Sequence, residues 1–468
     1  MNIFSDIEKY SSNPAIITED LEQFSYKEML HDADGIGKEA PGRPLVFVVT
    51  KNCVESLVGY IGLIRGGAVV ALVNHTIHET LFLNLIDKFK PQFIYLPSGF
   101  LNHIDNWREV YRFRSYTLLQ SGQVFDYKID ENTSLLLSTS GSTGSPEVVR
   151  LTDRNIISNT SSIADYLHIS SKDRAITTMP MSYSYGLSII NSHLYMGASV
   201  ILTEASVMKR RFWSLLNECA ATTFGGVPYI YEMLSKLKFA QMTVPSIEYI
   251  TQAGGKLNQT LLIEFSQISN DKSIQFIAMY GQTEATARMS YLPYDNLSAK
   301  LGSIGIAIPG GDFWLEDENG DQIKANDIPG ELVYRGDNVS LGYAKDYCDL
   351  EKGDVNKGIL KTGDVALKDQ DGYYYIVGRK KRFLKLFGNR INLDELEQKI
   401  RNIGHECACG GTDENLKIFS TDPEADRQIE KYVIELLHIN KTAFSIVNIE
   451  IIPRNHSGKT LYAQLEGL

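Results

Sequence analysis

The alternation of apolar strands with helical segments constrains the fold of this chain more than any other feature. Residues 44–49 (Pro-Leu-Val-Phe-Val-Val) predict a buried strand, residues 53–64 have helical spacing, and two glycines at 66–67 turn the chain into a second strand at 68–73. Strands joined by a crossover of this length are expected to be parallel. The chain is therefore predicted to begin with a βαβ unit.

The alternation repeats up to about residue 290. Further strands are predicted at 92–96, 198–202, 222–224, 246–250 and 274–278, and helices at 80–89, 211–220 and 257–268. From residue 302 onward, turns and short strands favour antiparallel or barrel-like structure. We predict an α/β fold, with a large N-terminal domain (residues 1–380) of helix-covered sheets plus a barrel-like β subdomain, and a small α+β C-terminal domain (residues 381–468).

The charge balance disfavours several classes of function. The 468 residues carry a formal net charge of -11, whereas binding to nucleic acid or to an anionic membrane needs a basic face. The apolar segment 57–73 is interrupted by Arg65 and by glycines, and is too short to span a bilayer. Residues 1–6 lack the basic and apolar regions of a secretory signal. We predict a soluble cytoplasmic protein with no nucleic-acid partner and no stable membrane insertion.

The five cysteines are scattered and odd in number, which is typical of reduced thiols in a reducing compartment. His405, Cys407 and Cys409 lie close together in the sequence, but Cys-x-Cys is not a usual zinc spacing. Small residues alternate through 406–410, and this pattern favours a strand over a metal site.

A loop rich in hydroxyl groups follows a predicted buried strand at 133–137. Residues 138–146 (Ser-Thr-Ser-Gly-Ser-Thr-Gly-Ser-Pro) form a flexible, donor-rich segment that suits an anion such as phosphate. The alternative is an ordinary Ser/Gly-rich connector, although such connectors seldom lie between a core strand and a helix. A helix is predicted over residues 151–157, with Thr152 or Asp153 near its N-cap. The loop lacks the Gly-Lys-Ser/Thr ending of a Walker-type site, which disfavours a phosphotransferase.

Three later segments carry chemistry that would complete a nucleotide site. Residues 278–284 (Ala-Met-Tyr-Gly-Gln-Thr-Glu) offer a ring to stack on a base, a glycine, a hydroxyl and a carboxylate for Mg²⁺. Residues 360–364 (Leu-Lys-Thr-Gly-Asp) place an acid that can accept hydrogen bonds from ribose, and residues 453–459 place a lysine on a glycine-containing loop. Each segment alone is typical of a turn, so the prediction depends on their joint occurrence in this order.

From about residue 133 to residue 462 the chain resembles the superfamily of adenylate-forming enzymes, which includes acyl-CoA synthetases, nonribosomal adenylation domains and firefly-type luciferases. The resemblance is carried by residues 138–146, 280–284, 330–332, 335–336, 362–364, 378–379, 388–391 and 455–459. It implies that a small-molecule carboxylic acid attacks the α-phosphate of ATP, with Mg²⁺, to give an acyl-adenylate and pyrophosphate. The thiol of CoA, or of the phosphopantetheine of an acyl carrier protein, then displaces AMP, and a mobile C-terminal domain swings between the two steps.

The resemblance also implies roles for individual residues. Lys459 would bridge the substrate carboxylate and the α-phosphate, Thr283 would contact the α-phosphate, and Glu284 would bind Mg²⁺, so these three are the implied catalytic residues. In the ATP site, the Ser/Thr/Gly loop would hold the β- and γ-phosphates, Tyr280 would stack near adenine, and Asp364 would bind the ribose hydroxyls. The implied ATP-binding residues are Thr139, Ser140, Gly141, Ser142, Thr143, Gly144, Gly254, Gly255, Lys256, Tyr280, Gly281, Gln282, Asp364 and Arg379.

Two further regions are assigned by position. Lys381 falls at the family's hinge, and the basic run 379–382 around it has two open interpretations: hinge and turn solvation, or contact with the phosphates of CoA. Tyr183, Tyr185 and Gly186 are predicted to line the acyl pocket, with an aromatic core patch as the alternative.

Two departures from the family pattern bear on these predictions. Glu147 stands where the family usually has Lys, so either its carboxylate points away from the triphosphate or Arg150 or Arg154 supplies the missing cation. Residues 183–186 lack the Asp of domains that bind an α-amino group, which favours an acid without one. The remaining alternatives are an adenylation domain that selects an amino or hydroxy acid, and a catalytically silent nucleotide- or acyl-binding homologue.

Overall fold

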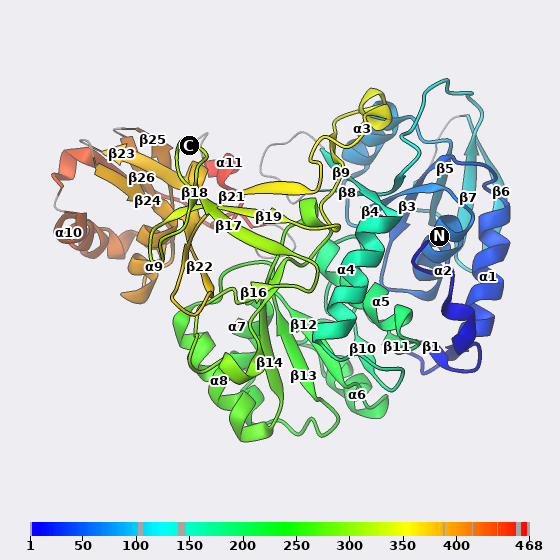
Figure 1. Cartoon of the computed structure of the whole chain (residues 1–468), viewed down its shortest axis with the longest axis horizontal. Helices are drawn as coiled ribbons and strands as arrows, with labels where there is room; N and C mark the ends of the chain where they lie inside the picture. Colours follow the sequence, from blue (N-terminus) through cyan, green and yellow to red (C-terminus); the bar gives the residue numbers. More distant parts are fainter. Residues whose placement is uncertain are drawn as a thin grey trace.

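The computed structural model describes residues 2–101, 106–138, 147–386, 389–413, 415–437, 439–454 and 460–465. Within these residues the strands form an eight-stranded sheet, a nine-stranded sheet, a five-stranded sheet and two small sheets near the C-terminus. Figure 1 shows the C-terminal elements at one end of the molecule, beside the five-stranded sheet, with the eight-stranded sheet toward the other end and the nine-stranded sheet across the lower part of the view.

The eight-stranded sheet is built around the predicted βαβ unit. β3 (Leu45–Thr50) and β4 (Val69–Asn74) are parallel, with α2 (Val54–Arg65) as their crossover, so this prediction is confirmed. Their valine-rich sequences are buried because an apolar cluster packs against each face of the sheet. The sheet order is β20-β9-β8-β4-β3-β5-β7-β6, in which the other strands are β5 (Phe93–Pro97), β6 (Trp107–Phe113), β7 (Tyr116–Ser121), β8 (Thr133–Ser138), β9 (Val148–Thr152) and β20 (Gly342–Ala344).

The nine-stranded sheet contains the second parallel region. Its order is β16-β15-β14-β13-β12-β10-β11-β1-β2, and the run from β14 to β1 is parallel. The predicted strands are present, with ends shifted by a few residues. Their bounds are β1 (Pro14–Ile17), β2 (Gln23–Ser25), β10 (Arg174–Ile176), β11 (Ser199–Ile201), β12 (Thr223–Gly226), β13 (Tyr249–Gln252), β14 (Gln275–Tyr280), β15 (Ser290–Tyr291) and β16 (Ile306–Ala307).

The helices pack between and outside these two sheets. One apolar cluster joins β3, β4 and β8 through α4 and α5 to β11, so α4 and α5 lie between the sheets. The predicted helices at 80–89, 211–220 and 257–268 are α3, α6 and α8. Helix bounds are α1 (Tyr26–Lys38), α3 (Glu79–Phe89), α4 (Asp153–Tyr166), α5 (Ser184–Tyr195), α6 (Arg210–Glu218), α7 (Pro228–Lys236) and α8 (Gln259–Lys272). No helix among the described residues is long and apolar enough to cross a membrane.

The turn-rich region after residue 302 forms an antiparallel sheet, as predicted. Its order is β18-β17-β19-β21-β22, with β18 and β22 at the two edges, so the barrel-like subdomain is an open five-stranded sheet. The bounds are β17 (Asp312–Glu316), β18 (Gln322–Ile323), β19 (Gly330–Arg335), β21 (Ile359–Lys368) and β22 (Tyr374–Arg379).

The elements after residue 380 have their own apolar clusters. A single 3-10 turn, η6 (Lys380–Arg382), joins β22 to β23 (Phe383–Leu386). Cys407 and Cys409 lie buried in β25, which confirms the predicted strand. The remaining bounds are β24 (Asn389–Asn392), α9 (Leu393–Asn402), β25 (Cys407–Thr412), β26 (Asn415–Ser420), α10 (Asp426–Leu437), β27 (Phe444–Asn448) and α11 (Tyr462–Leu465).

Candidate functional site

The hydroxyl-rich loop connects two antiparallel strands, β8 and β9, which pair Ser138 with Val148. The predicted phosphate-binding residues lie outside the described residues; they are Thr139, Ser140, Gly141, Ser142, Thr143 and Gly144. The helix predicted over 151–157 begins later than expected, because Leu151 and Thr152 complete β9. Thr152 is the N-cap of α4: its hydroxyl accepts from Asn155 N at 3.0 Å, and its own backbone N donates to Asn155 Oδ1 at 2.9 Å.

Three side chains from two other motifs meet at the carboxylate of Asp364. Tyr280 OH donates to Asp364 Oδ2 at 2.5 Å, and Gln282 Nε2 donates to the same oxygen at 3.1 Å. Arg379 Nε lies 3.5 Å from Asp364 Oδ1, because Asp364 and Arg379 face each other on β21 and β22. Gln282 Nε2 also donates to Thr362 O at 3.0 Å. The end of β14, the interior of β21 and the end of β22 therefore hold this cluster in place.

The Asp364 cluster is electrostatically constrained. Burial raises the pKa of Asp364 above its ordinary value, although Arg379, Tyr280 and Gln282 all favour the ionised form. Burial, together with the neighbouring carboxylate, raises the pKa of Tyr280 well above the ordinary tyrosine value. Tyr280 therefore stays protonated and acts as a hydrogen-bond donor to Asp364.

The predicted catalytic residues Thr283 and Glu284 lie on the 3-10 turn η3 (Thr283–Ala285) that follows β14. Thr283 Oγ1 is 3.2 Å from Ser184 Oγ on α5, and Glu284 Oε1 accepts from Tyr343 OH at 2.5 Å. Gly281, predicted to let backbone approach a phosphate, also has a packing reason, since a Cβ there would lie 1.8 Å from Ala287 O.

The predicted acyl-pocket residues lie at the start of α5. The rings of Tyr183 and Tyr185 meet edge to face with centroids 6.4 Å apart, and Tyr185 OH lies 2.8 Å from Thr251 Oγ1. A Cβ on Gly254 would lie 2.6 Å from Tyr183 OH, and one on Gly186 would lie 2.5 Å from Pro180 O. The structure thus brings the 183–186 segment and Gly254 together.

The neighbouring residues of the predicted ATP site are less enclosed. Gly255 would place a Cβ 3.1 Å from Pro228, and Lys256 is exposed, with its Nζ 3.4 Å from Ile376 O. Lys459 lies outside the described residues, and so does the side chain of Lys381, whose backbone belongs to η6. The roles of Lys459 and Lys381 stay predictions.

Glu147 has a partner that the sequence did not indicate. Lys345 Nζ lies 3.1 Å from Glu147 Oε1. Both arginines that were considered as the missing cation are engaged elsewhere in the protein. Arg150 is fully buried and donates to the carbonyls of Leu341, Lys352 and Gly353. Arg154 is bound to Asp337 at 2.9 Å. These contacts disfavour the alternative that Arg150 or Arg154 supplies the missing cation, and favour Lys345 as the cation nearest Glu147.

The basic run 379–382 is largely engaged within the protein. Arg379 faces Asp364, and Lys380 Nζ lies 2.7 Å from Glu331 Oε2. Arg382 is paired with Glu397 at 2.5 Å and with Asp394 at 2.9 Å. These contacts favour the turn interpretation over contact with the phosphates of CoA.

Sequence reasoning missed Tyr343, Lys345 and Arg288, all of which border the predicted site. Tyr343 and Lys345 lie on or beside β20, which pairs with β9 from nearly two hundred residues away, so no local pattern indicates them. Arg288 lies four residues after the recognised 280–284 motif. Its burial, which distinguishes it from an ordinary surface arginine, cannot be recognised from the sequence.

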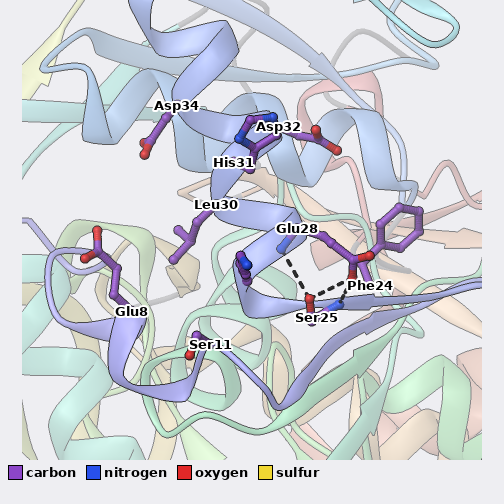
Figure 2. Close-up of a pocket in the computed structure, with 10 residues that line it drawn as sticks. Glu8, Ser11, Phe24, Ser25, Glu28, Leu30, His31, Asp32 and Asp34 are labelled. Carbon is purple, nitrogen blue, oxygen red and sulfur yellow. Dashed lines mark hydrogen bonds between the residues drawn. The ribbon is translucent and has the colours of Figure 1, made fainter.

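A hollow of about 970 Å³ lies beside α1 (Figure 2). Its wall includes the capping box of α1, in which Ser25 and Glu28 bond to each other, and the carboxylates of Glu8 and Asp34, which hold Arg65. None of the predicted site residues lines it. The Ser25, Glu28, Glu8 and Asp34 side chains in its wall are engaged in these structural contacts.

The nine-stranded sheet and the antiparallel five-stranded sheet together carry a residue set that suits a nucleotide: Tyr280 and Gln282 at the end of β14, and Asp364 and Arg379 on β21 and β22. Residues 4–344 match the model of the AMP-binding enzyme family, and the chain belongs to this family. It is 30% identical over 272 residues to a probable CoA ligase of Humulus lupulus, covering 57% of this chain and 50% of that relative. It is 26% identical over 363 residues to a long-chain-fatty-acid–CoA ligase of Escherichia coli O157:H7, covering 72% and 62%.

The matches thus span between half and two thirds of the length of these curated relatives. In contrast, the fold matches a solved structure over nearly its whole length. The O-succinylbenzoate coenzyme A synthetase from Bacillus subtilis, in complex with AMP, superposes with a TM-score of 0.79 at 21% identity, covering 98% of this chain and 97% of that chain. At this identity the likeness establishes the fold.

Proposed function

We propose that this protein is an AMP-forming acid–thiol ligase. It activates a carboxylic acid as an acyl-adenylate with release of pyrophosphate, and then transfers the acyl group to the thiol of CoA or of a carrier-protein phosphopantetheine. The observation that carries this proposal is the convergence of Tyr280, Gln282 and Arg379 on the buried carboxylate of Asp364. Family membership and the CoA ligases among its relatives support it.

Asp364 retains acceptor capacity for ribose hydroxyls. An ionised carboxylate offers about four lone-pair positions, and Tyr280 and Gln282 use those of Oδ2. Oδ1 faces Arg379 at 3.5 Å and is the oxygen that a ribose hydroxyl would reach. Arg379 is 58% exposed, so its remaining N–H groups can contact a phosphate.

Glu284 fits the role of Mg²⁺ ligand. Its Oε1 accepts the Tyr343 hydroxyl, while Oε2 has no hydrogen-bond partner among the described residues. A carboxylate oxygen is a ligand that Mg²⁺ prefers, and the ion would neutralise phosphate charge when bound. Thr283, the preceding residue, presents its hydroxyl beside Ser184 and can donate to a phosphate oxygen.

We further propose that residues 1–380 and 381–468 act as two domains joined at Lys381, and that Lys459 reaches the reacting carboxylate from the second. The separate sheets and apolar clusters after residue 380 support this division. The cytoplasm is the proposed compartment, supported by five cysteines that form no disulfide.

The direct test is exchange of labelled pyrophosphate into ATP, with Mg²⁺ and a panel of carboxylic acids. We expect exchange with at least one acid and thioester formation when CoA is added. Lys459→Ala should abolish exchange, yet keep thioester formation from supplied acyl-adenylate, because the lysine stabilises charge that grows only in the first step. Lys431→Ala, a substitution of an exposed lysine on α10, is the matched control.

Two results would count against the proposal. Equal loss of both half-reactions in Lys459→Ala would contradict the role of that lysine. Calorimetry that shows ATP binding, together with no exchange for any acid, would indicate a catalytically silent nucleotide-binding homologue instead.

A further inference from the structure

Arg288 is a buried cation without a counter-ion, located beside the predicted acyl pocket. We propose that its guanidinium forms an anion subsite that selects a carboxylic acid carrying a second carboxylate. This inference rests on the proposed function and specifies its substrate class.

The surroundings of Arg288 are neutral. The residue is 2% exposed, its Nε donates to Ser188 Oγ at 3.2 Å, and its Nη1 donates to Tyr166 OH at 3.1 Å. A weaker contact joins Nη1 to the thioether of Met279 at 3.4 Å, and Cζ lies 5.2 Å from the centre of the Tyr185 ring. Among the described residues, no carboxylate lies within ion-pair distance and Nη2 has no hydrogen-bond partner.

Arg150 shows what a structural arginine looks like in the same molecule. It is also buried; its Nη1 and Nη2 donate to the carbonyls of Leu341, Lys352 and Gly353, and its Nε has no hydrogen-bond partner among the described residues. Three carbonyl dipoles compensate its charge in place of an anion. Arg288 instead meets two hydroxyls, a sulfur and a ring, which compensate a buried charge poorly. An anion that reached Nη1 and Nη2 would pair in a low-dielectric region, where an ion pair is strong.

Helix α5 places this guanidinium at a defined distance from the reaction centre. Ser184 Oγ lies 3.2 Å from Thr283 Oγ1, and four residues later Ser188 Oγ lies 3.2 Å from Arg288 Nε. Four residues of α-helix rise about 6 Å. An extended acid with two or three carbons between its carboxyl groups separates the two carboxyl carbons by about 4–5 Å, since each bond of about 1.5 Å advances the chain by about 1.3 Å. The carboxylate oxygens extend this reach across such a gap. The subsite therefore fits a short dicarboxylic acid with one carboxylate at Thr283 and the other at Arg288.

The hydrogen-bonding geometry of the Arg288 guanidinium suits a carboxylate ligand. Arginine binds carboxylate through two parallel N–H groups, and Ser188 occupies Nε, so the Nη1–Nη2 edge is the one that remains. Met279 contributes the weakest contact on that edge and is the group that a carboxylate would replace. Tyr183, Tyr185 and Met279 belong to one apolar cluster, which would line the carbons between the two carboxylates.

The test compares succinate and glutarate with butyrate and valerate in pyrophosphate exchange. For the wild-type protein we expect kcat/KM to favour the dicarboxylates at least 10-fold. In Arg288→Met, which keeps an apolar side chain of similar length, the dicarboxylate-to-monocarboxylate ratio should fall about 100-fold, with partial recovery in Arg288→Lys. Arg154→Met, which removes an exposed arginine, should keep the wild-type ratio.

Binding gives a readout that does not depend on turnover. Glutarate should raise the unfolding temperature of the wild-type protein and of Arg154→Met, but not that of Arg288→Met, provided that the unliganded variant unfolds cooperatively. If Arg288→Met does not fold, the comparison uses Arg288→Lys.

The outcomes separate the two proposals. Suppose that the protein catalyses exchange with monocarboxylates, and that the dicarboxylate-to-monocarboxylate ratio of kcat/KM is one or less, or is unaltered by the Arg288 substitutions. This result would overturn the anion subsite and leave the proposed ligase activity intact. Glutarate binding that depends on Arg288, with no exchange for any acid, would support the subsite and contradict the ligase.

Discussion

Lys345 Nζ lies 3.1 Å from Glu147 Oε1, and this ion pair joins the residue after the hydroxyl-rich loop to the end of β20. The two residues come together because β20 is antiparallel to β9, with Ala344 opposite Val148. Lys345 is 66% exposed and Glu147 is 32% exposed, so the pair is at the surface, where ions of either sign can reach it. The carboxylate therefore holds a lysine that would otherwise be free to attract a phosphate.

We predict that Glu147→Gln tightens ATP binding a few-fold, because it releases Lys345, and that Lys345→Gln weakens it by a similar factor. Glu147→Lys should tighten binding further. Calorimetry with ATP measures each, and the double variant should show a coupling of about 0.2–1 kcal/mol, as for exposed ion pairs. Lys352→Gln removes a comparable surface pair with Asp349 and is the control. If both single variants bind ATP with the wild-type affinity, the Glu147–Lys345 ion pair does not influence nucleotide binding.

The Tyr343 hydroxyl competes for the proposed Mg²⁺ ligand. It donates to Glu284 Oε1 at 2.5 Å. Partial desolvation of the hydroxyl and the nearby carboxylate raise the pKa of Tyr343 above its ordinary value, although the residue is 43% exposed. Tyr343→Phe should free Oε1 and lower the Mg²⁺ concentration for half-maximal ATP binding by about 3- to 10-fold, the equivalent of one net hydrogen bond. A Mg²⁺ titration at fixed ATP measures this, and Tyr347→Phe is the control. An increased Mg²⁺ requirement would mean that the hydroxyl orients Glu284 for the ion.

We predict that the ionisable side chain of Asp364 lowers the stability of the folded protein as pH rises but strengthens ATP binding. Its folded pKa is raised, chiefly by burial, so its contribution to stability is present below the unfolded pKa of about 3.9 and is lost as pH rises through the folded pKa. Asp364→Asn cannot ionise, so its stability relative to wild type should rise over that window and then stay constant.

The same substitution should weaken ATP binding roughly 10- to 100-fold, the cost of losing a hydrogen bond to a charged group. Thermal unfolding from about pH 3.5 to about pH 8, which includes the unfolded pKa of about 3.9, tests the first part, and ATP calorimetry at the upper end of this range tests the second. A variant that becomes less stable than wild type as pH rises would contradict this reasoning, and would show that the pairing with Arg379 outweighs burial.

The sequence was most informative where the signal is local or where a motif is recognised. The alternation around Val46 and Val70 predicted parallel strands because burial on both faces leaves continuous apolar runs. Tyr280 and Asp364 were assigned to one site by family motifs, and the structure brings them together. Lys345 and Arg288 were not assigned, since their importance comes from non-local pairing and from burial. Leu151 was placed in a helix because the strand that precedes the N-cap has no signal apart from its pairing with β8.

Arg382 connects the hinge region to the C-terminal elements through a buried ion pair. Its guanidinium lies 2.5 Å from Glu397 Oε1, and its Cζ lies 3.7 Å from the centre of the Tyr462 ring. Glu397 is 2% exposed. Glu397→Gln should lower the free energy of unfolding by about 3 kcal/mol, because it leaves a buried guanidinium with Asp394 as its remaining counter-ion.

Denaturant unfolding measures this loss, and a matched control separates it from a surface effect. Arg401→Met removes another partner of Glu397, one that is 40% exposed, and should cost less than about 1 kcal/mol. Replacing both members, with Arg382→Met and Glu397→Leu, should recover most of the stability, since apolar side chains can replace a buried ion pair. If Arg382→Met instead raised the KM for CoA and left stability unaltered, the basic run would contact the CoA phosphates, and Arg382 would not be a structural residue.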